Sequence, residues 1–267
     1  MDLGLGGRVA LVSGAHRGTG AGIARILAAE GAAVAVHGFA PGQSAAVVDV
    51  IVAAGGRAVG VDDDLSSDEG AARVVADVED RLGPIEVLVN NYGAPIDSTW
   101  ESPADRWHDA WDRNVLTGVR LTHRVLPHMR ERGWGRVIFL GTIGTARPGD
   151  RNPDYYGAKA ALPAVARSLA KHLRGSGITV NVVSPGLIAT DEVKAMILRR
   201  FAEATSPSGE VSWEDAAAWG ALHVMPNLTE RIATPDDIGR MVAFVASEAA
   251  WHLQGADIRI DGGALDA

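Results

Sequence analysis

A tyrosine and a lysine lie four positions apart at the start of an Ala-rich stretch that reaches to about Arg174. They are Tyr155 and Lys159. On an α-helix this spacing places both side chains on one face, with Cβ atoms about 5–6 Å apart. A phenol has a reference pKa of about 10, and a nearby ammonium lowers that pKa because it favours the phenolate. The pair therefore predicts a general acid/base, although such pairs also arise by chance.

The composition limits the function classes. The chain has 267 residues, a net charge of −8 and no basic cluster, which argues against a nucleic-acid partner. No apolar run approaches the roughly 20 residues of a membrane span, and the N-terminus lacks the basic start and apolar stretch of a signal peptide. The absence of cysteine excludes disulfides, thiol nucleophiles and Cys-ligated metals, and it is typical of a cytosolic protein, although composition alone also explains it. We therefore expect a cytoplasmic protein with no membrane contact and no metal site.

Short apolar runs alternate with amphipathic helical stretches along the whole chain. Val/Ile-rich runs of this kind are typical of strands buried on both faces of a parallel sheet. The alternation predicts a doubly wound α/β fold, and with no linker in sight we expect one domain over residues 1–267. The predicted strands are 8–13, 33–37, 57–61, 85–90, 136–140, 178–183 and 258–260, and the helices are 18–30, 44–54, 67–81, 104–131, the stretch from Tyr155, and 235–246.

A glycine-rich turn joins the first predicted strand to the first predicted helix. It reads Ser13-Gly14-Ala15-His16-Arg17-Gly18-Thr19-Gly20. Glycines at these positions permit a tight turn and close approach of the backbone to a phosphate, which the N–H groups at the helix start would face. The spacing is one residue longer in its first step than the common dinucleotide fingerprint, and a tight turn alone also explains three glycines. The strand before and the helix after favour the binding function.

At this point the chain resembles the classical short-chain dehydrogenase/reductase family over nearly its whole length. The motifs are Ser13-Gly14-x-x-x-Gly18-x-Gly20, Asn90-Asn91-Tyr92-Gly93, Asn114, Thr142, Tyr155-x-x-x-Lys159, Ser184-Pro185-Gly186 and Asp261-Gly262-Gly263. The resemblance implies a seven-stranded Rossmann sheet and hydride transfer between a nicotinamide cofactor and an alcohol/carbonyl pair.

The resemblance also implies roles for four catalytic residues. Tyr155 would exchange the proton with the substrate oxygen, while Lys159 would lower the pKa of Tyr155 and bind the nicotinamide ribose. Thr142 stands where the family usually has serine, and its hydroxyl offers the same donor and acceptor. Gly141 also replaces a common serine, which bears on how the substrate oxygen is held. Asn114 would anchor a water chain to Lys159, although an asparagine packed against another subunit is the alternative.

The choice of cofactor depends on the end of the second strand. An acid there usually holds a 2′-hydroxyl, whereas a nearby arginine suits a 2′-phosphate. Gly38 occupies the place of the acid, and Arg17 matches the basic residue of NADP-preferring relatives, but Phe39 stands where many of them have a second arginine. We expect NADP, with NAD as the second choice.

The expected cofactor-binding set follows from the same resemblance. Asp64 and Leu65 would flank the adenine, while the neighbouring Asp62 and Asp63 are interpreted as solvated loop charges. The full set is Ser13, Gly14, Arg17, Gly18, Gly20, Phe39, Asp64, Leu65, Asn91, Gly93, Tyr155, Lys159, Pro185, Gly186, Ile188 and Thr190.

Two residues depart from the family. Tyr92 stands where an alanine is common, and its ring could stack on the cofactor, line the substrate cleft or belong to the core. Pro163 lies inside the predicted Tyr155 helix, where it cannot donate to the Lys159 carbonyl and should bend the helix.

The least regular part of the chain is residues 191–234. It is rich in large side chains, namely Met196, Phe201, Trp213, Trp219, His223 and Met225. As a hypothesis, this segment is a lid that closes over an apolar substrate of more than a few carbons. A helical patch buried against another subunit is the alternative. Arg147 and Arg151, before Tyr155, are interpreted as solvated charges in preference to ligands of an anionic substrate group.

Other protein classes would require sequence features that this chain does not have. A redox-sensing regulator that binds the cofactor without turnover would carry a broken catalytic set, whereas Asn114, Thr142, Tyr155 and Lys159 are all present. An epimerase or dehydratase of the extended branch would need a larger C-terminal domain, and a zinc dehydrogenase in its usual form would need cysteines. The resemblance implies a homotetramer or homodimer packed through the 104–131 helix, the Tyr155 helix and the last strand. The sequence does not identify the small-molecule substrate.

Overall fold

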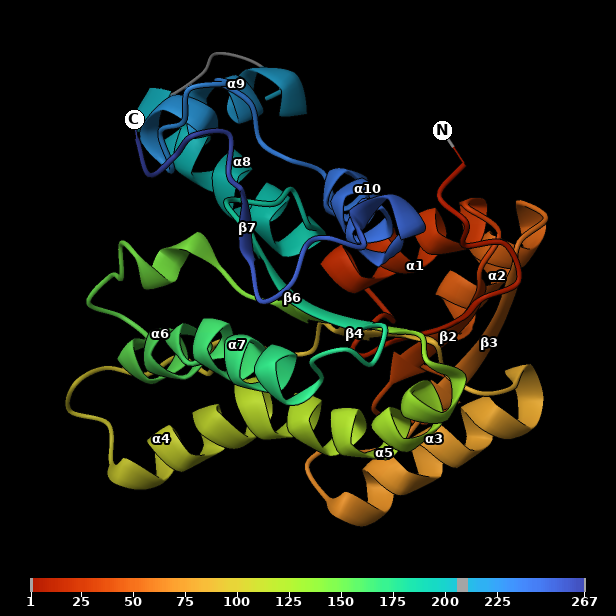
Figure 1. Ribbon diagram of the computed structural model, residues 1–267. Helices are drawn as coiled ribbons and strands as arrows, with labels where there is room; N and C mark the ends of the chain where they lie inside the picture. The colour runs from red at the N-terminus through yellow and green to blue at the C-terminus, as the bar shows by residue number, and fades with distance from the viewer. Residues whose placement is uncertain (1, 206–210, 267) are drawn as a thin grey trace.

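The computed structural model describes residues 2–205 and 211–266, and its centre is one parallel β-sheet (Figure 1). The sheet has seven strands in the order β3-β2-β1-β4-β5-β6-β7, as the resemblance implied. All the pairings between neighbouring strands are parallel. The strands are β1 (Val9–Val12), β2 (Ala33–Gly38), β3 (Arg57–Asp62), β4 (Val87–Asn90), β5 (Gly135–Leu140), β6 (Ile178–Pro185) and β7 (Asp257–Ile260).

Helices cover both faces of the sheet (Figure 1). Successive strand residues point to opposite faces, so Val9 and Leu11 enter one apolar core while Ala10 and Val12 enter the other. This explains why the central strands are continuous apolar runs. One core is closed by α1 (Gly18–Ala29), α2 (Ala45–Ala53) and α10 (Pro235–Ala246), and the other by α3 (Asp68–Leu82), α5 (Thr117–Arg132) and α7 (Leu162–His172).

The predicted helix over residues 104–131 is not continuous. It consists of α4 (Ala104–Trp111), a π-helical turn η1 (Asp112–Leu116) and then α5. Two side chains bond to backbone carbonyls at this break: Asn114 Nδ2 donates to the Ala110 carbonyl at 2.9 Å, and Thr117 Oγ1 donates to the Arg113 carbonyl at 2.9 Å. Such side-chain bonds compete with the regular ladder, and π-turns often mark functional positions. The break therefore places Asn114 in an irregular turn.

The predicted Tyr155 helix is also divided, as Pro163 led us to expect. A single residue, Ala161, separates α6 (Pro153–Ala160) from α7, which begins at Leu162. Short 3₁₀ turns precede α6 and follow α10, at η2 (Ile143–Thr145) and η3 (Glu248–Ala250).

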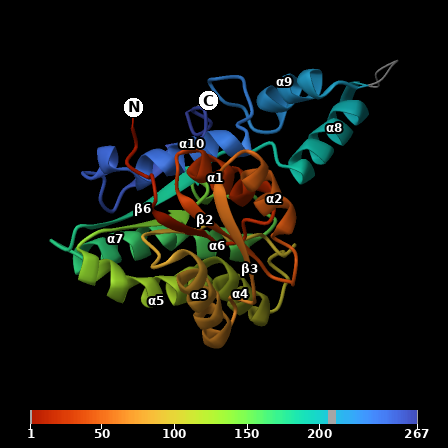
Figure 2. The same cartoon turned by 90° about the vertical axis from the view of Figure 1, so that its right-hand side faces the viewer.

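The segment predicted to be irregular contains two helices, α8 (Asp191–Thr205) and α9 (Trp213–His223), while residues 206–210 of this segment lie outside the described part of the chain. The Phe201 and Trp219 rings meet across the two helices at 6.0 Å. Both helices stand out from the sheet and its covering helices (Figure 2). The base of the segment is closed where Ala189 N donates to the Ala233 carbonyl at 2.8 Å. Among the described helices, none is both long and apolar enough to cross a bilayer.

Candidate active site

Tyr155 and Lys159 lie on α6 beside the carboxyl end of β5. Pro153 occupies the first turn of α6, where its missing N–H costs no hydrogen bond. Lys159 is buried at 3% exposure, and its Nζ donates to the Leu140 carbonyl at 2.8 Å. An ammonium carries three donors, so this bond leaves capacity for a ligand.

Thr142 follows β5 directly and reaches Tyr155. Its backbone is extended, and its Oγ1 accepts a hydrogen bond from Gly144 N at 3.1 Å. The Thr142 hydroxyl also lies near enough to Tyr155 to lower the pKa of its phenol. The preceding Gly141 has no room for the serine common at that place, because a Cβ there would lie 2.5 Å from Ser184 Oγ.

Asn114 and Lys159 meet at Gly93. A Cβ at Gly93 would lie 2.5 Å from Asn114 Oδ1 and 2.7 Å from Lys159 Nζ, so only glycine fits between them. The φ of +152° at Gly93 also disfavours a side chain. Asn114 Oδ1 is buried and has no hydrogen-bond partner among the described residues. The structure thus brings Asn114, Thr142, Tyr155 and Lys159 together with Gly93, and we call these five residues the Tyr155 cluster.

The proton affinities in the Tyr155 cluster differ from the sequence-based expectation. The pKa of Tyr155 is raised to about 12, mainly by burial and also by the neighbouring Tyr156, and the nearby Thr142 hydroxyl opposes both effects. Burial lowers the pKa of Lys159 to about 8. The structure shows no lowering of the Tyr155 pKa by Lys159, because burial dominates the proton affinity of both groups.

The glycine-rich turn wraps around the carboxyl end of β1. Gly14 and Gly18 have φ values of +61° and +56°, a conformation that glycine adopts at little cost. Asn91 Nδ2 donates to the Ser13 carbonyl at 2.8 Å, and Ser13 Oγ accepts from Tyr92 N at 3.0 Å. These bonds tie the turn to the end of β4.

The N-terminus of α1 points out of this turn without a side-chain cap. Arg17 is the N-cap residue and its side chain makes no capping hydrogen bond. By contrast, Ser67, Ser212 and Thr234 cap α3, α9 and α10. The first N–H groups of a helix without a side-chain cap form a site for a phosphate.

His37 is a residue that the sequence analysis did not assign to the site. It is fully buried in β2, its Nδ1 accepts from Gly14 N at 3.0 Å, and its Nε2 donates to the Asp63 carbonyl at 2.9 Å. Gly14 N fixes Nδ1 as the acceptor, so the ring is neutral with its proton on Nε2. Burial lowers the pKa of His37 to about 4. A polar residue inside an otherwise apolar strand was the available signal.

A second group of predicted residues consists of Gly38 and Phe39, at the end of β2, and Arg17, on the glycine-rich turn. Together with Asp62 we call them the Gly38 corner. The exposed Arg17 guanidinium pairs with Glu192 at the start of α8. The Phe39 ring packs on Tyr92 at a centroid distance of 4.3 Å. Tyr92 therefore roofs the glycine turn beside Phe39, and its phenol pKa is raised by burial.

Asp62 was interpreted as a solvated loop charge, and that interpretation is wrong. Asp62 ends β3 directly opposite Gly38 in the strand register. Its Oδ2 accepts from Gly42 N at 2.9 Å and its Oδ1 from Ser44 N at 3.3 Å. Asp63 is likewise held, because Arg73 donates to both of its carboxylate oxygens.

The other expected cofactor residues lie along the same edge of the sheet. Asp64 is exposed, where bonds from Ser66 lower its carboxyl pKa, and Leu65 is fully buried in the core. Pro185 ends β6, and Gly186 N donates to the Ile260 carbonyl at 3.0 Å. Ile188 pairs with Ala233, and the Thr190 methyl lies 3.5 Å from where a Cβ at Gly18 would be. Thr190 therefore reaches the glycine turn.

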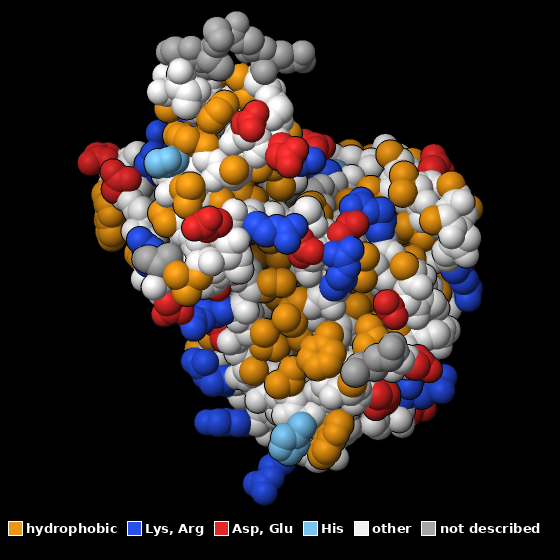
Figure 3. Space-filling view, turned by 90° about the horizontal axis from the view of Figure 1, so that it is seen from above, with side chains coloured by type: hydrophobic (Ala, Val, Ile, Leu, Met, Phe, Trp, Pro, Cys, Tyr) orange, Lys and Arg blue, Asp and Glu red, His pale blue; other side chains and the backbone are white. Residues whose placement is uncertain are grey.

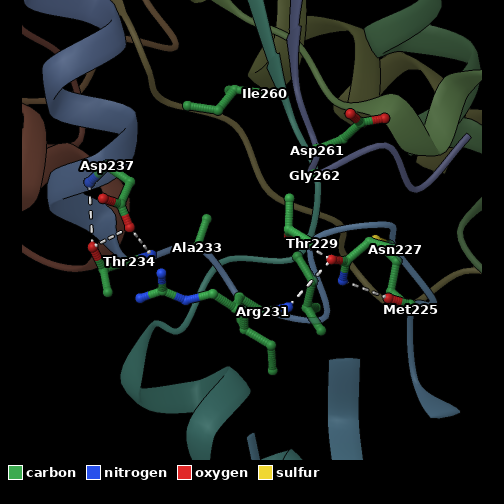
Figure 4. Close-up of a pocket in the computed structure, with 12 residues that line it drawn as sticks. Met225, Asn227, Thr229, Arg231, Ala233, Thr234, Asp237, Ile260, Asp261 and Gly262 are labelled. Carbon is green, nitrogen blue, oxygen red and sulfur yellow. Dashed lines mark hydrogen bonds between the residues drawn. The ribbon is translucent and has the colours of Figure 1, made fainter. Parts of the chain in front are cut away.

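A cavity of about 290 Å³ lies beside the segment that follows β6, and Leu187 of that segment is part of its lining (Figure 4). Asp237 and Thr234 bond to one another at one side, and Asn227 and Thr229 at the other. Residues of the Tyr155 cluster do not line it. Elsewhere, the Arg147 guanidinium donates to the Ala264 carbonyl at 2.8 Å, and Arg151 pairs with Asp97.

Comparisons with known proteins agree with this geometry. The family model described as Enoyl-(Acyl carrier protein) reductase matches residues 14–264. The Short-chain reductase protein NovJ of Streptomyces niveus is 34% identical over 256 residues, which cover 96% of this chain and 93% of that protein. L-Sorbose reductase from Gluconobacter frateurii, complexed with NADPH and L-sorbose, is 30% identical with a TM-score of 0.88 over 100% of both chains. A 7α-hydroxysteroid dehydrogenase complexed with NADH and 7-oxo glycochenodeoxycholic acid is 28% identical with a TM-score of 0.83, over 98% of this chain and 96% of that one.

Proposed function

The chain belongs to the short-chain dehydrogenase/reductase family, and we propose that it transfers a hydride between a nicotinamide cofactor and a carbonyl or secondary alcohol, with Tyr155 as the general acid/base. The observation that carries this proposal is the Tyr155 cluster. The Thr142 hydroxyl lies near Tyr155 and lowers the pKa of its phenol, and Gly93 leaves room for Lys159 and Asn114 to meet. A regulator that only binds the cofactor has no need of this arrangement.

The residues present fit a dinucleotide. The N–H groups at the start of α1 lack a side-chain cap and suit the pyrophosphate. Asn114 Oδ1 is a buried acceptor that has no partner among the residues that the structure describes, as a water or ligand donor would require. The nicotinamide ring, when bound, supplies or accepts the hydride. Ser13, the glycine turn, Asn91, Gly93, Pro185, Gly186, Ile188 and Thr190 would hold the cofactor, with Lys159 at the ribose.

The protein side chains supply the proton and hold the substrate oxygen. A Tyr155 pKa raised to about 12 keeps the phenol protonated at neutral pH, so it can donate to a carbonyl oxygen during reduction. Thr142 offers its hydroxyl to the same oxygen. Lys159, whose pKa is lowered to about 8, exchanges protons near neutrality and would return one to Tyr155 through water anchored by Asn114.

NADP is the proposed cofactor, with NAD as the second choice. β2 contributes no acid to the ribose end, and Arg17 stands on the glycine turn beside it. The bound NADPH in L-sorbose reductase supports the same choice. Arg17 would exchange its exposed pairing with Glu192 for the 2′-phosphate, and surface ion pairs of this kind are worth at most about 1 kcal/mol.

The substrate is proposed to be a small and fairly apolar molecule beneath α8 and α9. These two helices belong to the proposed lid, which is residues 191–234 of a chain that forms a single domain. They face the carboxyl ends of the strands. Exposed Leu222 and Leu228 belong to the same segment. The face of the molecule seen from above carries hydrophobic side chains between charged groups (Figure 3). Deleting the lid and finding unchanged substrate affinity would dispose of the lid.

A homotetramer or homodimer in the cytoplasm is the proposed form of the protein. β7 is an edge strand of the sheet, and an apolar depression of about 490 Å³ lies between α5 and α7. Its apolar lining includes Val119, Phe139, Val165 and Leu169. Light scattering of the purified protein would report the number of subunits.

One experiment tests the function. The protein is titrated with NADPH and NADH by fluorescence, and carbonyl and alcohol panels are then screened with the cofactor that binds more tightly. We expect tighter NADPH binding, and at least equal affinity for NADH would contradict the cofactor assignment. Tyr155→Phe should keep cofactor binding and lower turnover by about 10³-fold or more. Near-normal turnover in this variant would remove Tyr155 from its role.

A further inference from the structure

Asp62 places a carboxylate beside Gly38, although β2 itself has no acid there. A Cβ at Gly38 would lie 2.3 Å from Asp62 Oδ1. In an aspartate, the carboxylate oxygens lie roughly 2.4 Å from their own Cβ, as covalent bond lengths require. Asp62 Oδ1 is therefore as close to this point as the oxygen of an aspartate at position 38 would be. The two residues are cross-strand partners of β2 and β3, which explains the overlap.

The Asp62 carboxylate is held in place. It accepts hydrogen bonds from Gly42 N and Ser44 N, one on each oxygen, and it is half-buried. Each carboxylate oxygen can accept about two hydrogen bonds, so both retain capacity for a hydroxyl donor.

The charge of Asp62 is directed toward the glycine turn. Burial lowers the pKa of both His16 and His37, which lie in the turn and beneath it, and the charge of Asp62 offsets part of this lowering. Among the charged groups of this region, Arg17 pairs with Glu192 and Asp63 pairs with Arg73. Asp62 forms no ion pair with any residue that the structure describes. A 2′-phosphate at this point would gain Arg17 and meet Asp62, whereas a 2′-hydroxyl could donate to Asp62.

Resting on the proposed function, we propose that Asp62 is a specificity-determining residue of the Gly38 corner. Its carboxylate, supplied by β3 in place of β2, accepts a hydrogen bond from a 2′-hydroxyl and repels a 2′-phosphate. The preference for NADP over NAD is therefore weaker than Gly38 and Arg17 alone would make it. This also accounts for Gly38, because any side chain there would displace Asp62.

A purely structural Asp62, holding only the 42–44 turn, predicts a different result. Loss of that role would weaken NADH and NADPH binding together and leave their ratio unchanged. Loss of the specificity role moves the two affinities in opposite directions. The ratio of the two dissociation constants is thus the informative readout.

The experiment measures NADH and NADPH dissociation constants of the full chain by fluorescence in wild type, Asp62→Asn and Asp62→Ser. Serine keeps one acceptor for the 42–44 turn, so it serves if the asparagine variant folds poorly. We expect the NADPH preference to rise about tenfold in both variants, as removal of one unfavourable charge pair near a surface implies. Asp63→Asn is the matched control, because it removes a neighbouring charge that pairs with Arg73, and its ratio should change less than about twofold.

The outcomes separate the two proposals. A ratio that stays within about twofold of wild type in both Asp62 variants, or a control that shifts it equally, overturns the role of Asp62 while wild-type cofactor binding still supports the proposed function. A wild type that binds neither cofactor overturns both.

Discussion

The Tyr155 cluster and the Gly38 corner lie at the carboxyl edge of the same sheet but follow the family pattern to different degrees. In the cluster, each position carries the family residue or, at Thr142, a hydroxyl equivalent, and Lys159 and Asn114 are buried. In the corner, glycine replaces the acid, Phe39 replaces a cation and Asp62 approaches from another strand. Arg17 is exposed there.

The difference separates the chemistry from the choice of cofactor. A proton transfer needs groups within hydrogen-bond reach of one another, so small changes in the cluster are expected to be costly. Recognition of a 2′-substituent is a balance of charges near solvent, and several arrangements achieve it. Substitutions in the cluster should therefore change rates by orders of magnitude, whereas those in the corner should shift a ratio.

Apart from loss of the Tyr155 hydroxyl, the largest effect is expected from Gly93→Ala. Its Cβ would lie 2.5 Å from Asn114 Oδ1 and 2.7 Å from Lys159 Nζ, so these two groups must move apart. We expect kcat/KM to fall about 10²-fold, the effect of a displacement near 1 Å in an active site. Gly149→Ala is the control, since its Cβ would meet nothing closer than 4.0 Å. Equal kcat/KM values in the two variants would show that the cluster tolerates displaced side chains. The contrast between the Tyr155 cluster and the Gly38 corner would then not hold.

His37, beneath the corner, predicts a pH dependence of stability. Its pKa is about 4 in the folded protein against 6.5 as a model value, so between these values the unfolded chain binds the additional proton. Stability should therefore fall as the pH falls from 6.5 to 4, by about 2 kcal/mol or more from this residue. Urea unfolding at pH 7 and pH 4.5 measures the loss, which should be smaller in His37→Asn. An identical loss in both proteins would show that His37 does not titrate in this way.

The smallest effect is expected from Phe39→Arg, which restores the second cation of NADP-preferring relatives. The new guanidinium would face a 2′-phosphate near solvent, and exposed charge pairs contribute up to about 1 kcal/mol. We expect the NADPH to NADH affinity ratio to rise about fivefold, with kcat changed less than twofold. A fall of kcat by more than tenfold would show that the two regions are coupled.

Much of the fold and of the Tyr155 cluster could be predicted because the signals are local. The apolar period of the strands, the glycine spacing and the four-residue step from Tyr155 to Lys159 lie within short windows of sequence. Pro163 likewise predicted the break between α6 and α7.

The Gly38 corner could not be predicted in the same way. Asp62 approaches Gly38, and His37 supports Gly14, through the pairing of strands that are separated by a helix in the sequence. The π-turn at Asn114 depends on side-chain bonds that compete with the helix ladder. The raised pKa of Tyr155 depends on burial, which spacing on a helix does not reveal. Helices α8 and α9 gain their order from contact with each other.

The most direct test of the central claim follows deuterium from NADPH labelled at the nicotinamide C4 position. Wild type and Tyr155→Phe are compared with a carbonyl substrate found in the panel, and the alcohol product is analysed by mass spectrometry. We predict deuterium in the wild-type product, and no detectable product from Tyr155→Phe, although it binds NADPH within about twofold of wild type. Wild-type product without deuterium, or labelled product at a near-normal rate from Tyr155→Phe, would contradict the account.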